Sequence, residues 1–201
     1  MTKHYHTILL DIDNTITRLQ PTLDLMARVF RRVPKLEEEI TSFRLSEAYH
    51  VSRAKELDFW QTYETEICQH SQVSATRLEY ILENYTTKDT IVYIMTSRDQ
   101  KHYDDTYDWL VKNGLRFNQL FCVGKSSKVK LLEELKIEAV FEDNPDFFYE
   151  LWDEGLYTRI DTYCIDHPYN QHVPTKYRLH RDTGEHLPVG EMASDTLASY
   201  K

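Results

Sequence analysis

The chain has 201 residues, long enough for one hydrophobic core plus a small additional module, and its 41% hydrophobic content excludes a disordered or fibrous protein. Lys and Arg number 24 against 33 Asp and Glu, a formal net charge of −9 that disfavours polymeric nucleic acid as a partner. Because no run has the length of a signal peptide or the ~20 apolar residues of a membrane helix, we expect a soluble, cytoplasmic protein without membrane contact.

The first predicted element is a buried parallel strand over residues 6–12, an apolar run that ends abruptly in acidic residues. Two aspartates, Asp11 and Asp13, lie at its carboxyl end. Side chains alternate along a strand, so both carboxylates point to the same side. One can act as a nucleophile towards phosphorus while the other transfers a proton, which makes this pair the candidate catalytic centre.

The next segment, 18–88, shows helical patterns around 21–33, 46–70 and 74–85 and no convincing strand. We interpret it as a small all-helical cap inserted after the first strand. Aromatic residues at helical spacing more often form a core than a substrate site. The candidates for substrate contact in the cap are nevertheless its aromatic residues, Phe43, Tyr49, Phe59, Trp60 and Tyr63.

A second buried strand is predicted over 90–95, followed by a helix over 101–113. Thr96 and Ser97 follow this strand directly. Their hydroxyl and backbone N–H groups are suited to binding the oxygens of a phosphate. We therefore predict Thr96 and Ser97 to be phosphate-binding residues.

A third strand, predicted over 119–123, leads into a helix over 127–136. Two lysines in this connection, Lys125 and Lys128, can place a fixed positive charge against the phosphate and the nucleophile. We favour Lys128, because it opens the helix that precedes the next strand. Lys125 stays open as the alternative.

The fourth predicted strand, 138–141, ends in Glu142 and Asp143 and is followed by a helix over 145–154. Two like charges at the first strand require a cation to hold an ionised nucleophile beside a phosphate. Carboxylate oxygens, a backbone carbonyl and water form the shell that Mg²⁺ prefers. Asp143 is the best-placed additional metal ligand. We expect Glu142 and Asp146 to orient the Asp143 side chain without contacting the metal themselves.

A fifth strand is predicted over 157–165, and residues 171–201 read as a polar C-terminal extension with a hairpin around 182–184 and a tail from about residue 190. Strands and helices alternate from residue 89 onwards, which predicts an α/β fold with a central parallel sheet covered by helices on both faces. The catalytic core then comprises 1–17 and 89–170, with the cap at 18–88. Polar residues at the carboxyl ends of successive strands meet at the edge where such sheets bind ligands.

These residues resemble the motifs of the haloacid dehalogenase (HAD) superfamily of aspartate-nucleophile phosphatases, whose core is Rossmann-like. The run DIDNT resembles its first motif, Thr96-Ser97 its second, Lys128 its third and Glu142-Asp143 its fourth. Within it the chain is most similar to the 5′(3′)-deoxyribonucleotidases and related bacterial nucleotidases. That likeness rests on the helical cap and on the phrases IVYIMTSR, VFEDNP and DHPYN.

The resemblance implies a Mg²⁺-dependent phosphomonoesterase acting on a nucleoside monophosphate through an aspartyl-phosphate. It assigns Asp11 as nucleophile and metal ligand, Asp13 as acid/base and backbone-carbonyl ligand, and Lys128 as charge stabiliser. Glu142 departs from the pattern, because many relatives have aspartate there. Since the motifs bind only phosphate and metal, two alternatives stay open: a phosphatase for polynucleotide ends, and a phosphate-ester binding protein with little turnover.

Overall fold

The computed structural model describes residues 3–188, which form a seven-stranded sheet with the strand order β3-β2-β1-β4-β5-β6-β7. All neighbouring strands up to β6 are parallel, and β7 pairs antiparallel with β6. The predicted α/β class with a central parallel sheet is thus confirmed. The strands are β1 (Thr7–Leu10), β2 (Ile91–Thr96), β3 (Gln119–Cys122), β4 (Ala139–Glu142), β5 (Asp161–Asp166), β6 (Tyr177–His180) and β7 (His186–Leu187).

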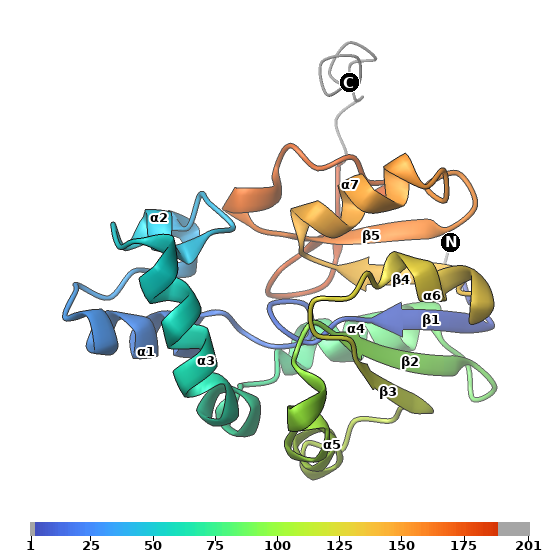
Figure 1. Ribbon diagram of the computed structural model, residues 1–201. Coiled ribbons are helices and arrows are strands. Elements are labelled where there is room, and N and C mark those ends of the chain that lie inside the picture. The colour runs from blue at the N-terminus through green and yellow to red at the C-terminus, as the bar shows by residue number, and fades with distance from the viewer. Residues whose placement is uncertain (1–2, 189–201) are drawn as a thin grey trace.

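Two layers of helices cover the sheet, as Figure 1 shows. On one face, α4 (Ala75–Tyr85) and α5 (Tyr103–Lys112) pack against one set of strand side chains that includes Ile8 and Leu10. On the other, α6 (Val129–Glu134) and α7 (Pro145–Asp153) pack against the opposite set, which includes Leu9. Consecutive residues of β1 therefore enter two different cores, because strand side chains alternate between the two faces.

A third core belongs to a helical cap that stands beside the sheet (Figure 1). The cap contains α1 (Gln20–Phe30), the 3₁₀ turn η1 (Glu37–Glu39), α2 (Leu45–Ala48) and α3 (Arg53–His70). Two antiparallel segments connect it to the sheet, held by hydrogen bonds from Arg18 N to Gln72 O at 2.8 Å and from Ser74 N to Ile16 O at 2.9 Å. The cap is thus inserted after β1, as the sequence predicts.

The sequence places the cap boundary at residue 88, whereas α4 packs on the sheet. Leu78, Ile81 and Tyr85 of α4 lie in the same buried cluster as Ile8 and Leu10 of β1. An apolar helix face has the same spacing whether it packs on a cap or on a sheet, so periodicity alone could not assign this helix. The cap spans α1 to α3, and the chain returns to the core at Gln72–Ser74.

The C-terminal extension likewise joins the sheet instead of following it. The backbone of β6 pairs with β5 from Tyr163↔Tyr177 to Asp166↔His180, and Gly184 lies in the predicted hairpin before β7. The part of the extension beyond residue 188, including the predicted tail, lies outside the described residues.

The fifth strand itself starts later than predicted, because residues 157–160 form a turn. Within the described part of the chain, no helix is both long and apolar enough to cross a membrane.

Candidate active site

The loop after β1 presents Asp11 at the carboxyl edge of the sheet. Asp11 is buried, and its backbone N–H donates to Phe141 O of β4 at 3.1 Å. Asn14 adopts a left-handed conformation, with φ of 62°, which Asn tolerates better than most residues. The chain then turns back, since the N–H groups of Thr15, Ile16 and Thr17 all donate to Ile12 O. This turn fixes the position of Asp11 relative to its neighbours.

A buried ion-pair network joins Asp11 to the start of α6 and the end of β4. The Lys128 ammonium donates to Asp11 Oδ1 at 2.5 Å and to Glu142 Oε2 at 2.7 Å, and all three side chains are buried. Although burial lowers the pKa of Lys128, the two carboxylates outweigh it and raise that pKa above its usual value. Lys125, the alternative, is exposed. The structure therefore brings Lys128, and not Lys125, to Asp11.

Asp143 is held by the β1 loop and by the segment after β5. Its Oδ1 accepts a hydrogen bond from Thr15 Oγ1 at 3.1 Å, and its Oδ2 accepts one from the Tyr169 hydroxyl. The Asn170 amide donates to Asp143 O at 2.9 Å. Three residues from these two segments thus orient Asp143.

The carboxylates of Asp11, Glu142 and Asp143 lie close enough to hold a metal ion, with one oxygen of each within 4.8 Å of the others. Burial, followed by the Glu142 charge, raises the pKa of Asp11 to about 7. Burial and the Asp11 charge also raise the pKa of Asp143 to about 7. Three buried carboxylates meet a single ammonium here, so the site lacks positive charge. A hard divalent cation with oxygen ligands, such as Mg²⁺, fits this arrangement.

Glu142 is less suited to direct ligation than the two aspartates. One of its oxygens bonds Lys128, and the other accepts the backbone N–H groups of Asp143 and Asn144, both at 3.2 Å. Within residues 3–188, by contrast, Oδ2 of Asp11 has no hydrogen-bond donor. Asp146, which the sequence predicts to orient Asp143, is exposed in the first turn of α7. Its backbone N–H donates to Asn144 Oδ1 at 2.9 Å.

The raised pKa values predict how metal-free protein responds to pH. Between the usual pKa of 3.8 and the folded-state value of about 7, the native protein holds protons that the unfolded chain has lost. The free energy of unfolding therefore falls as pH rises through this window, and Mg²⁺ restores it. Melting curves with and without Mg²⁺ on both sides of about pH 7 measure this effect.

Asp143→Asn serves as the matched variant for that experiment. Removing this buried charge is expected to raise the melting temperature of metal-free protein at high pH and to remove most of the Mg²⁺ response. Asp153→Asn, at the exposed end of α7, is expected to behave as wild type. Equal Mg²⁺ stabilisation of wild type and Asp143→Asn would contradict the assignment of the metal site.

The two remaining predicted groups lie at the ends of β2 and β1. Thr96 is buried, and its hydroxyl accepts the backbone N–H of Arg98 at 3.2 Å, whereas Ser97 is exposed. Asp13 is half-exposed and forms a bidentate ion pair with Arg98. Both aspartates of the β1 loop therefore have a cationic partner, Lys128 for Asp11 and Arg98 for Asp13.

Sequence reasoning did not single out Arg98, His167 or Tyr169 as site residues. His167 is buried, and its Nε2 donates to Asn14 O at 3.1 Å, while burial lowers its pKa to about 3. The neutral ring stacks on Tyr169 at 4.9 Å between centroids. The signal was available in the phrase DHPYN, which follows the last long strand and so falls at the ligand-binding edge.

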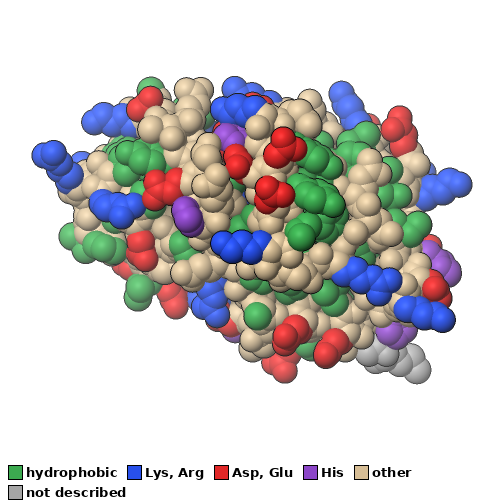
Figure 2. All heavy atoms as spheres, turned by 90° about the horizontal axis from the view of Figure 1, so that it is seen from below, with side chains coloured by type: hydrophobic (Ala, Val, Ile, Leu, Met, Phe, Trp, Pro, Cys, Tyr) green, Lys and Arg blue, Asp and Glu red, His purple; other side chains and the backbone are tan. Residues whose placement is uncertain are grey.

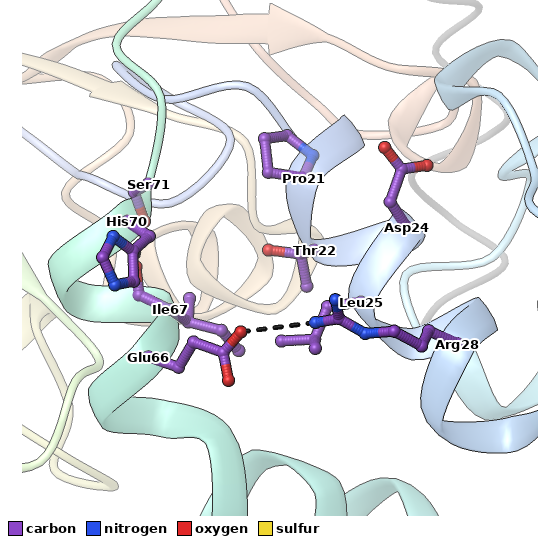
Figure 3. A pocket seen from close by; sticks show the side chains of 9 residues that line it. All are labelled: Pro21, Thr22, Asp24, Leu25, Arg28, Glu66, Ile67, His70 and Ser71. Carbon is purple, nitrogen blue, oxygen red and sulfur yellow. Dashed lines mark hydrogen bonds and ion pairs between the residues drawn. The ribbon is translucent and has the colours of Figure 1, made fainter.

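A pocket of about 200 Å³ opens in the cap between α1 and the C-terminal end of α3, and Figure 3 shows the side chains that line it. An ion pair between Arg28 and Glu66, 3.4 Å long, bridges the two helices. Ser71 lines the pocket and also accepts a hydrogen bond from Arg98 at 3.2 Å. The other lining residues are Pro21, Thr22, Asp24, Leu25, Ile67 and His70. The pocket wall is therefore linked through Arg98 to Asp13.

The predicted aromatic candidates of the cap mostly fill its core. Tyr49 and Phe59 are buried in the cap cluster, and Trp60 and Tyr63 pack against it. Phe43 is partly exposed and lies 5.6 Å from the Tyr169 ring. None of these five residues lines the pocket of Figure 3.

Known proteins are similar to this chain in both sequence and fold. A nucleotidase of Clostridium acetobutylicum is 26% identical over 83% of this chain and 85% of its own length. A proposed nucleotidase of Halalkalibacterium halodurans is 27% identical over 83% and 82%. The chain matches no protein-family model.

Among solved structures, a HAD-superfamily hydrolase of Geobacter sulfurreducens superimposes with a TM-score of 0.51 at 12% identity, covering 88% of this chain and 92% of its own. A proposed β-phosphoglucomutase of Thermotoga maritima has the same TM-score at 15% identity, covering 89% and 95%. At such identities the superpositions concern the fold alone. The chain is therefore a distant relative of bacterial nucleotidases and has the fold of the haloacid dehalogenase superfamily.

Proposed function

We propose that this protein is a Mg²⁺-dependent phosphomonoesterase that hydrolyses a nucleoside monophosphate through an aspartyl-phosphate on Asp11. The observation that carries the proposal is the buried network of Asp11, Lys128, Glu142 and Asp143 at one edge of the sheet. Such a network provides a carboxylate with one uncommitted oxygen beside a fixed positive charge. The sequence similarity to nucleotidases supports the same reaction.

In this proposal, Asp11 attacks phosphorus as the bond to the leaving oxygen breaks, and Asp13 gives that oxygen its proton. Asp13 then takes a proton from water, whose oxygen attacks the phosphorus of the aspartyl-phosphate and releases inorganic phosphate and Asp11. Lys128 favours the ionised form of Asp11, and Thr96 and Ser97 bind phosphate oxygens. Asp11, Asp143 and the Asp13 carbonyl would hold Mg²⁺, which would offset the negative charge that the carboxylates and phosphate bring together.

Phosphate release from a panel of ribo- and deoxyribonucleoside monophosphates, with and without Mg²⁺, tests this function. We expect Mg²⁺-dependent release that chelation abolishes. Tight nucleotide binding without any release would favour the alternative of a binding protein. The intact Asp13 speaks against that alternative, because binding does not require an acid/base group.

A phosphatase for polynucleotide ends is the second candidate, and the surface charge speaks against it. Figure 2 shows Lys and Arg side chains interspersed with acidic ones on one face, without a continuous basic stripe. A phosphate backbone needs such a stripe, and its binding weakens steeply with salt. Faster turnover of 3′-phosphorylated oligonucleotides than of mononucleotides, with strong salt inhibition, would favour this candidate.

We further propose that the cap pocket of Figure 3 holds the leaving group of the ester. Thr22→Trp fills the pocket and is expected to raise KM for a nucleoside monophosphate by at least about tenfold. Hydrolysis of acetyl phosphate, whose leaving group is small, should change little. Thr65→Trp, at an exposed position of α3 outside the pocket, is the matched control. An unchanged KM in Thr22→Trp would place the leaving group elsewhere.

A further inference from the structure

Arg98 is a buried cation next to the catalytic aspartates. It lies two residues after the end of β2, and its side chain is only 4% exposed, whereas that of Asp13 is 43% exposed. Its Nε donates to Asp13 Oδ2 at 3.0 Å and its Nη2 to Asp13 Oδ1 at 2.9 Å. A bidentate pair of this kind fixes the plane of a carboxylate as well as its position.

The rest of the guanidinium is anchored to both the core and the cap. Its Nη2 also donates to Ser71 Oγ at 3.2 Å, and its Nη1 donates to Thr106 Oγ1 of α5 at 3.4 Å. Its central carbon lies 5.6 Å from the centre of the Trp109 ring, and the Trp109 indole donates to Ser71 O at 2.9 Å. Ser71 is the C-cap residue that follows α3, so the same cation contacts the segment where the chain leaves the cap for the core.

We propose that Arg98 is a positioning residue, which holds the Asp13 carboxyl group in place to give its proton to the leaving oxygen; the proposal rests on the phosphatase function above. A cation beside a phosphate site can instead bind the phosphate itself. Here the four hydrogen bonds to Asp13, Ser71 and Thr106 occupy all but one of the N–H groups of the guanidinium. Arg98 therefore has little capacity left for a phosphate.

The two roles differ in how they depend on the leaving group. An alkoxide, such as the one that leaves from a nucleoside monophosphate, must be protonated as it departs, whereas 4-nitrophenolate leaves without a proton. The parameter kcat/KM reports the steps up to departure of this group, before water attacks the intermediate. Loss of the positioned acid therefore lowers kcat/KM for the nucleotide far more than for 4-nitrophenyl phosphate, whereas loss of a phosphate ligand lowers both equally.

The experiment compares kcat/KM for the two esters in wild type, Arg98→Met and Asp13→Asn, with Mg²⁺ present. We expect Arg98→Met to lower the value for the nucleotide by on the order of 10²-fold and that for the aryl ester by less than about tenfold, the same pattern as Asp13→Asn. Arg98→Lys should recover only part of the loss, because an ammonium cannot make the bidentate pair.

Equal losses for both esters, together with weaker inhibition by inorganic phosphate, would overturn the proposal. If Arg98→Met fails to fold, Thr106→Val decides the question, since it removes one anchor of the guanidinium and leaves the pair with Asp13. It should shift the ratio of the two kcat/KM values in the same direction, and an unchanged ratio would contradict the proposal. A wild type that hydrolyses neither ester would refute the phosphatase function instead.

Discussion

Asp11→Asn is expected to lower phosphate release from a nucleoside monophosphate by at least about 10³-fold, the scale on which loss of a covalent nucleophile acts. The amide cannot form the acyl-phosphate, and it also removes one of the two aspartate ligands available to Mg²⁺. Steady-state assays at saturating Mg²⁺ measure the loss. Because the substitution removes a buried charge whose pKa is raised to about 7, the variant should remain folded.

Asp108→Asn is the control for that experiment. Asp108 is exposed on α5, so the same chemical change there should leave the rate of hydrolysis unaltered. Circular dichroism and thermal melting of both variants separate loss of chemistry from loss of structure. Undiminished turnover by folded Asp11→Asn would show that another group accepts the phosphate.

Lys128→Met is expected to damage both stability and activity. The substitution leaves the Asp11 and Glu142 carboxylates buried without their common partner, which typically costs about 3–5 kcal/mol in free energy of unfolding. It also removes the charge that stabilises the phosphoryl group in the transition state, a loss on the order of 10²-fold in kcat. Denaturant unfolding without metal and kinetics with Mg²⁺ measure the two effects separately.

Lys125→Met makes the same change at the exposed lysine of the same loop and should be near wild type in both measurements. Mg²⁺ should restore part of the stability of Lys128→Met, because the cation compensates some of the same carboxylate charge. A Lys128→Met variant as stable and active as wild type would contradict the central place of Lys128 in the ion-pair network.

Sequence analysis was most successful for residues that follow the carboxyl ends of strands. Asp11, Lys128 and Asp143 come from three segments, yet the carboxyl ends of parallel strands share one edge, so their proximity follows from the order of elements. Lys128 was preferred over Lys125 because it lies at the predicted start of a helix. These inferences need only local patterns and one topological rule.

The contacts that the sequence did not locate depend on tertiary packing. Arg98 reaches Asp13 from the loop after β2, and nothing in the sequence around Arg98 distinguishes a buried guanidinium from a solvated one. Tyr169 bonds Asp143 from the loop after β5. Likewise, α4 joined the core because its apolar face meets the sheet, and β6 extended the sheet despite its polar sequence. The hydrophobic period and the composition of a segment do not identify the surface against which it packs.

The most direct test of the proposed reaction is to trap the phosphorylated enzyme. Wild-type protein with Mg²⁺ and a nucleoside monophosphate is quenched in acid during the first turnover, and the phosphorylated peptide is identified by mass spectrometry. We predict a hydroxylamine-sensitive phosphate on Asp11 that is absent from Asp11→Asn. Release of inorganic phosphate in the first turnover with no phosphate on Asp11, or with the label on another residue, would contradict the assignment of Asp11 as the nucleophile.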